Sequence, residues 1–141
     1  MFNCAKQVNV LGTNYNIIIT NEEKLPRLND ETAGLCYVNT KQIAINNYEN
    51  DAIDKSEEKD ICIQKQKVLR HEIVHAYSEE SGISNFNEID NDFIVDWIAK
   101  QAPKMLISFL ECGALSEDVI GKITKIINHQ YDDNFTFIEN N

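Results

Sequence analysis

The sequence predicts an α+β domain, with a small N-terminal sheet of three or four strands followed by three or four helices. In the first third of the 141 residues, β-branched side chains alternate with polar ones, which is the period of a half-buried strand. From about Ser56 onward, apolar residues recur every three or four positions instead, as on one face of a helix. The apolar share of 43% and the charged share of 26% are typical of a globular chain, so one packed core is expected.

The expected strands form two pairs. The first pair covers residues 8–10 and 15–19, with a turn over residues 12–14 that contains glycine and asparagine. The second pair covers residues 35–39 and 42–46, again with turn-forming residues between the strands. These segments predict an antiparallel or mixed sheet.

The first helix is expected from about Ser56 to Gly82, because a glycine is a natural helix stop. Residues 47–59 are charged and nearly lack large apolar groups, which indicates a solvated loop or the frayed start of this helix. The apolar residues that recur at helical spacing are Ile61, Val68, Leu69, Ile73 and Ala76.

Two further helices are expected after Gly82. One begins near Asn87, carries Phe93 and Trp97 one turn apart, and is ended or kinked by Pro103, because proline lacks the backbone donor. The other is capped by Ser116. Its apolar stripe, which we expect to be buried, consists of Val119, Ile123, Ile126 and Ile127.

Charge and composition narrow the possible partners and the compartment. The chain has 13 Lys and Arg against 23 Asp and Glu, and its net charge of −10 argues against binding to nucleic acid or to an anionic membrane. No apolar run resembles a membrane span or a secretory signal, so we expect a cytoplasmic monomer. The four cysteines form no C-x-x-C pair, so we expect reduced thiols rather than a disulfide framework.

The most informative segment is His71-Glu72-Ile73-Val74-His75, an H-E-x-x-H pattern on the first expected helix. Two histidines four positions apart project from the same side of a helix, so both imidazoles can reach one zinc ion. Glu72 lies about 100° further round, which suits a general base for a zinc-activated water. By chance, such a pattern would occur in a chain like this with odds on the order of one in two hundred. The alternative is a helix with two solvent-facing histidines and an ordinary surface glutamate.

A catalytic zinc ion needs a third protein ligand. Asp92 fits best, and Asp96, one turn further along the same helix, would accept the free ring N–H of a ligand histidine. Glu88 and His129 are the competing third ligands, and a plain solvated acidic face is the alternative interpretation of the aspartate pair.

Two other features have both a structural and a functional interpretation. Tyr77 follows the motif and could stabilise a developing oxyanion, or it could pack in the core. The strand over residues 42–46 could lie at the sheet edge and hold an extended peptide, or it could be internal and fully paired.

Three segments resemble the small zincin-type metallopeptidases of Gram-positive bacteria and their phages, ImmA/IrrE-like in layout. They are VNVLGT at residues 8–13, VLRHEIVHA at 68–76 and NDFIVDWIA at 91–99. The resemblance implies a minimal zincin-like domain over residues 1–138, with residues 139–141 as a short tail.

The same resemblance implies a site. It places zinc on His71 and His75, assigns Glu72 as the base, and takes an acidic third ligand from the following helix. In gluzincins that helix carries Glu-x-x-x-Asp, whereas this chain has Asp92-x-x-x-Asp96, with a first side chain shorter by one methylene.

These expectations combine into a zinc-dependent peptidase that hydrolyses peptide bonds in an intracellular protein substrate. One alternative is a non-catalytic metal-binding protein with an acidic surface, acting in phage–host interaction or as an inhibitor. Another alternative is a zinc amidohydrolase that acts on a different amide.

Overall fold

The computed structural model describes residues 2, 4–29, 31–48, 55–85 and 91–132. Internal contacts divide the chain into two compact units, Met1–Ala102 and Pro103–Asn141, where the sequence predicts one domain over residues 1–138. The first unit contains the sheet and every residue of the candidate site described below.

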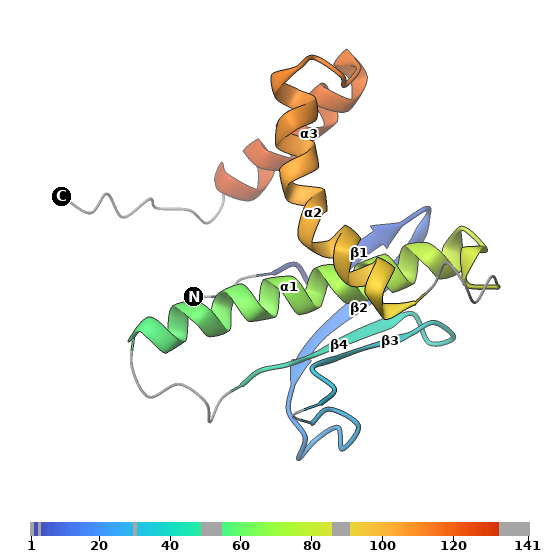
Figure 1. The fold of residues 1–141 in the computed structure, drawn as a ribbon, viewed down its shortest axis with the longest axis vertical. Helices are drawn as coiled ribbons and strands as arrows, with labels where there is room; N and C mark the ends of the chain where they lie inside the picture. Colours follow the sequence, from blue (N-terminus) through green and yellow to red (C-terminus); the bar gives the residue numbers. More distant parts are fainter. Residues whose placement is uncertain (1, 3, 30, 49–54, 86–90, 133–141) are drawn as a thin grey trace. The chain divides into compact units, whose positions relative to one another are not determined.

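The first unit is built on a four-stranded mixed sheet with the order β1-β2-β4-β3 (Figure 1). Its strands are β1 (Gln7–Val10), β2 (Thr13–Thr20), β3 (Gly34–Tyr37) and β4 (Gln42–Asn46). The pairs β1–β2 and β3–β4 are antiparallel, whereas β2 and β4 run parallel. The predicted α+β class and the mixed sheet are therefore confirmed.

The two hairpins differ slightly from the predicted boundaries. The β1–β2 turn consists of Leu11 and Gly12, which have φ angles of 50° and 95°. Positive φ at both positions is the geometry of a type I′ turn, whose twist matches the flanking strands. Thr13 and Asn14, expected in the turn, therefore belong to β2. In the second hairpin β3 ends at Tyr37, so the last two residues of the predicted strand lie in the turn.

The strand next to β4 at the edge of the sheet is β3. Because β4 is paired on both sides, the strand over residues 42–46 is internal, the second of the two alternatives for it. Its three central residues are fully buried, which explains their uninterrupted apolar character. The strand that could accept an extended peptide on this side is therefore β3.

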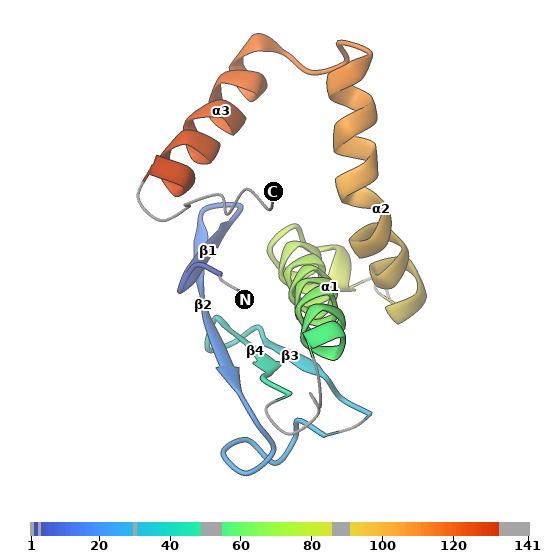
Figure 2. The ribbon, with the colours of Figure 1, turned by 90° about the vertical axis from the view of Figure 1, so that its left-hand side faces the viewer.

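A long helix, α1 (Lys55–Glu80), covers one face of the sheet (Figures 1 and 2). The hydrogen bond from the Gly82 amide to the Glu79 carbonyl closes its last turn, with Gly82 at φ 80°. The helix stop predicted at this glycine is confirmed. The core between α1 and the sheet consists of Val10, Tyr15, Ile43, Ile45, Val68 and Ala76.

The C-terminal end of α1 is tied to both hairpins through one carboxylate. Glu80 accepts hydrogen bonds from the Tyr15 hydroxyl at 2.7 Å, from the Thr13 hydroxyl at 2.8 Å and from the Lys41 ammonium. These bonds, with that from Lys41 the strongest, lower the pKa of Glu80 to about 2. We call Glu80 and these three partners the Glu80 cluster.

A short 3₁₀ turn, η1 (Ile83–Asn85), leads toward α2 (Asp92–Glu111). The Asn91 side chain caps α2 by accepting a hydrogen bond from the Ile94 amide at 3.0 Å. The start predicted near Asn87 falls outside the described residues. Pro103 lies within α2, so it does not end the helix.

The buried face of α2 differs from the one that Phe93 and Trp97 suggested. Those two aromatic side chains are 80% and 52% exposed, whereas Val95 and Ala99 are buried. The Arg70 Nε atom of α1 donates to the Ala99 carbonyl at 2.8 Å, and this bond fixes which side of α2 faces α1. The face that carries Asp92, Val95, Asp96 and Ala99 therefore turns toward α1.

The described part of the second unit consists of the end of α2 and α3 (Glu117–Asp132). The predicted cap is confirmed, because the Val119 amide donates to the Ser116 hydroxyl at 3.4 Å. The prediction of a buried stripe on α3 is wrong, since Val119, Ile126 and Ile127 are exposed. Ile123, the fourth residue of the stripe, is partly buried.

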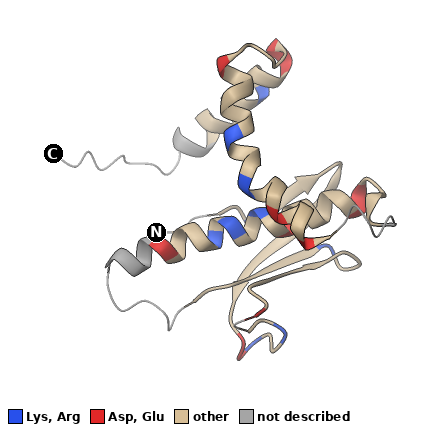
Figure 3. Cartoon of the chain, in the orientation of Figure 1, with Lys and Arg blue, Asp and Glu red and all other residues tan. Residues whose placement is uncertain are grey.

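Basic and acidic residues both occur along α1 and α2, as the blue and red segments of Figure 3 show. Within the described residues, no helix combines the length and apolar character needed to cross a membrane.

Candidate metal centre

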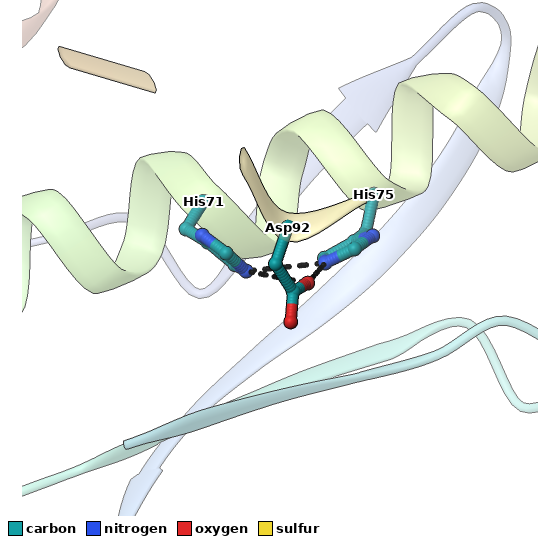
Figure 4. A group of neighbouring side chains, drawn as sticks. All are labelled: His71, His75 and Asp92. Carbon is teal, nitrogen blue, oxygen red and sulfur yellow. Dashed lines mark hydrogen bonds and ion pairs between the residues drawn. The ribbon is translucent and has the colours of Figure 1, made fainter. Parts of the chain in front are cut away.

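The two motif histidines of α1 point toward each other across one turn of the helix (Figure 4). The His71 Nε2 and His75 Nε2 atoms are 3.1 Å apart, and the rings meet edge to face with centroids 4.8 Å apart. Both side chains are partly buried, so neither is an ordinary solvent-facing histidine. The helix period places the two residues on one face, since positions i and i+4 lie one turn apart.

Asp92, the first residue of α2, brings a carboxylate to the same point. Its Oδ1 atom lies 3.4 Å from His75 Nε2 and 3.8 Å from His71 Nε2. The Asn91 cap and the Arg70 hydrogen bond to Ala99 fix where α2 begins and how it packs on α1. Among the described residues, His71, His75 and Asp92 form the group whose ligand atoms all lie within 4.8 Å of one another.

The spacing of these three atoms suits a small tetrahedral ion. Atoms that bind one zinc ion at about 2.0–2.1 Å lie roughly 3.3 Å apart. The three observed separations of 3.1, 3.4 and 3.8 Å bracket that value. Two imidazoles and one carboxylate are also a donor set typical of catalytic zinc, which leaves a further position for water or substrate. The residues present therefore fit a zinc ion.

Asp96 supports the site through the other nitrogen of His71. Its Oδ1 atom lies 2.9 Å from His71 Nδ1, and this contact lowers the pKa of Asp96. A carboxylate at this distance accepts the Nδ1 proton, so the lone pair of His71 lies on Nε2, the nitrogen that faces His75 and Asp92. The structure brings Asp96 to the position that the sequence predicted for it.

Glu72 lies in the same cleft as the three candidate ligands but outside their group. Its side chain is only 5% exposed, and burial raises its pKa to about 7. The electrostatic interaction with His71 opposes this shift, and the negative charge of Asp92 adds to it. A carboxyl group with such a pKa can both accept and release a proton near neutral pH.

The site opens into a cleft of about 550 Å³ between α1 and the edge strand β3. Acidic side chains outnumber basic ones along its walls, with Lys67 as the basic residue among the lining positions. Such a cleft concentrates cations, which assists metal capture. The carboxylates that line it are Glu31, Glu72, Glu79, Asp92 and Asp96.

The structure does not bring Tyr77 into this cleft. Tyr77 lines a separate apolar groove between α1 and α2, and it is 45% exposed. Two positions beyond His75, it lies about 200° round the helix, on the opposite side from the ligands. His129 is exposed on α3 and does not belong to the three-residue group found among the described residues. Glu88 lies outside the described residues.

Sequence reasoning missed two contributors to the site. Arg70 orients α2 through the Ala99 carbonyl, and β3, not β4, forms the cleft wall. The first could have been suspected from an arginine beside the motif, whereas the strand order has no local signal in the sequence.

Comparisons of this chain with protein-family models, with curated proteins and with solved structures find no match. The interpretation of the site therefore rests on its own geometry and chemistry.

Proposed function

We propose that the chain is a zinc-dependent peptidase that cleaves an intracellular protein substrate. The observation that supports this most is the convergence of two imidazole nitrogens and one carboxylate oxygen beside a buried glutamate. When bound, a zinc ion supplies a Lewis acid that polarises a peptide carbonyl and makes water more acidic. A purely structural zinc site has four protein ligands and no use for a neighbouring base, so three donors with Glu72 favour catalysis.

Each residue has a defined role in this proposal. His71, His75 and Asp92 would hold the ion, and Asp96 keeps the proton of His71 on Nδ1. The Glu72 carboxylate accepts a proton from the attacking water and donates it to the leaving amide nitrogen as the peptide bond breaks. Its raised pKa suits both transfers.

The edge strand β3 supports an extended peptide as substrate. On its inner side β3 pairs with β4, and its other side borders the cleft. The Asn46 amide bonds to the Ala33 carbonyl, and antiparallel bonds alternate along a strand, so the backbone N–H and C=O of Gly34 point away from β4. An extended chain could add to this edge by backbone hydrogen bonds.

The test is Glu72→Gln, assayed on a mixture of fluorescence-quenched peptides together with zinc binding by calorimetry. We expect zinc affinity to be retained and turnover to fall roughly 10²- to 10⁴-fold, because the proton acceptor is lost while the ligands remain. Glu117→Gln is the matched control, since it makes the same chemical change at an exposed position of α3.

Three results would contradict the proposal. Equal turnover in the Glu72→Gln variant and the wild type would remove Glu72 from the reaction. Stoichiometric zinc without cleavage of any peptide would favour the non-catalytic alternative, and cleavage of simple amides but not of peptides would favour an amidohydrolase.

A further inference from the structure

Gly34, in the edge strand β3, lies directly against the glutamate of the motif. A Cβ atom built on Gly34 would lie 2.6 Å from Glu72 Oε1, 2.9 Å from Glu72 Cγ and 2.7 Å from Val68 Cγ1. Non-bonded carbon atoms in proteins are usually 3.5–4.0 Å apart at closest, so no side chain fits there without movement. The backbone of β3 and the side chain of Glu72 are therefore in contact because this residue has no Cβ.

The need for glycine at this position comes from space and not from backbone conformation. Gly34 is not among the residues with positive φ, so any amino acid could adopt its extended backbone. Glycine inside a strand is unfavourable by itself, because it loses more conformational freedom than other residues and packs no side chain. Gly34 is the first residue of β3, and a glycine within a strand is typical of a close approach by another group. Here the approaching group is the Glu72 carboxylate.

We infer that Gly34 is a positioning residue for Glu72. Two of the three nearest atoms that a side chain would meet belong to Glu72, and the third belongs to Val68. Both residues are nearly fully buried, but Val68 packs within the apolar core cluster whereas Glu72 stands outside it, so Glu72 is the side chain that we expect to move. A methyl group at position 34 would displace the carboxylate from its place beside the histidine pair, while His71, His75 and Asp92 would keep theirs.

The contact can be tested without any substrate or metal by a double-mutant cycle on thermal stability. Gly34→Ala should lower the Tm of the metal-free protein by roughly 5 °C, as expected for one overpacked contact in a small domain. In a Glu72→Ala background, which removes two of the three nearest atoms and leaves the contact with Val68, the same substitution should cost clearly less. Gly121→Ala on α3 is the matched control, because nothing lies within 4 Å of its Cβ position, and it should leave Tm unchanged or raise it.

Every outcome of the cycle decides the question. An equal loss of Tm in both backgrounds would overturn the inference, because the clash would then not involve Glu72. If Gly34→Ala alone fails to fold, folding of the double variant Gly34→Ala/Glu72→Ala supports the inference, and failure of both contradicts it.

The functional consequence rests on the proposed peptidase activity and has its own measurement. Zinc affinity of Gly34→Ala should stay within about twofold of the wild type, because the substitution touches none of the three ligands. The Gly34→Ala substitution should move the Glu72 carboxylate by about an ångström. The kcat on the quenched-peptide mixture should therefore fall about a hundredfold, with little change in KM. The pH profile of kcat should also shift. Parallel losses of zinc affinity and kcat would indicate general damage and contradict a positioning role. If the wild type cleaves no peptide, the proposed function is wrong. The double-mutant cycle still tests the contact between Gly34 and Glu72, because it needs no substrate.

Discussion

Two glutamates of the same helix, two turns apart, lie in opposite electrostatic environments. Glu80 receives hydrogen bonds from Lys41, Tyr15 and Thr13, and its pKa falls to about 2. Glu72 is buried, and the described residues offer it no hydrogen-bond donor, so its pKa rises to about 7. Both residues are acidic and both are on α1, yet only one of them can exchange a proton near neutral pH.

The difference separates a structural carboxylate from a reactive one. The donors around Glu80 keep it ionised and hold the end of α1 against both hairpins, which fixes the helix that carries the histidines. Glu72 lacks such donors and keeps a high affinity for its proton, as a general base must. Burial without hydrogen-bond donors therefore marks the candidate reactive group, and a full set of donors marks the structural one.

The largest effect that tests this comparison is the pH dependence of stability in the metal-free protein. Because the folded pKa of Glu72 lies above its ordinary value of 4.5, its contribution to stability is full below pH 4.5 and is lost as the pH rises through 7. That loss amounts to about 3 kcal/mol in the free energy of unfolding. Urea denaturation across this range should show it in the wild type and not in Glu72→Gln. If the free energy of unfolding changes equally with pH in the two proteins, the contrast between Glu72 and Glu80 is wrong.

The Glu80 cluster should respond to pH in the opposite direction. Because the folded pKa of Glu80 lies below 4.5, its contribution to stability is present above that pH and is lost as the pH falls through about 2. Glu80→Gln should therefore lower Tm at pH 7, with a difference from the wild type that shrinks as the pH approaches 2. A Tm difference that stays constant over this range would show that the charge of Glu80 plays no part.

Asp96→Asn should weaken zinc binding by roughly tenfold to a hundredfold without removing any ligand, because the His71 tautomer would no longer be held by a carboxylate. Calorimetric titration with zinc measures this. The control is Asp118→Asn, an exposed aspartate on α3 whose partner is Lys122, and its zinc affinity should match the wild type. Equal zinc affinity in Asp96→Asn would remove this residue from the site.

The smallest expected effect concerns one hydrogen bond of the Glu80 cluster. Thr13→Val keeps the shape of the side chain but removes the hydroxyl that donates to Glu80. The free energy of unfolding should fall by about 1 kcal/mol, with zinc affinity unchanged. Loss of zinc binding in this variant would show that the Glu80 cluster and the metal site are coupled.

Local sequence patterns predicted much of the fold and the centre of the site. Alternation found the strands, and the helix period placed His71 and His75 together, because both signals depend on neighbours within a few residues. The four-residue spacing of Asp92 and Asp96 likewise predicted that both lie on one helix face, where each contacts a motif histidine.

The remaining features depend on how distant segments pack. The sequence alone does not show that β3 is the edge strand. The apolar stripe of α3 has the pattern of a buried face, although most of it is exposed. The oxyanion role considered for Tyr77 depended on its closeness to the motif in sequence, whereas its angle round α1 places it on the other side of the helix. Gly34 had no local signal either, because its role depends on a contact with a residue on another element.

The most direct test of the central claim is the zinc content of the wild type and of Asp92→Ala after equilibration with equimolar zinc and removal of free metal. If His71, His75 and Asp92 bind one ion together, the wild type should retain about one zinc per chain and Asp92→Ala should lose most of it. A wild type without zinc, or an Asp92→Ala variant that retains it fully, would contradict the proposed metal centre.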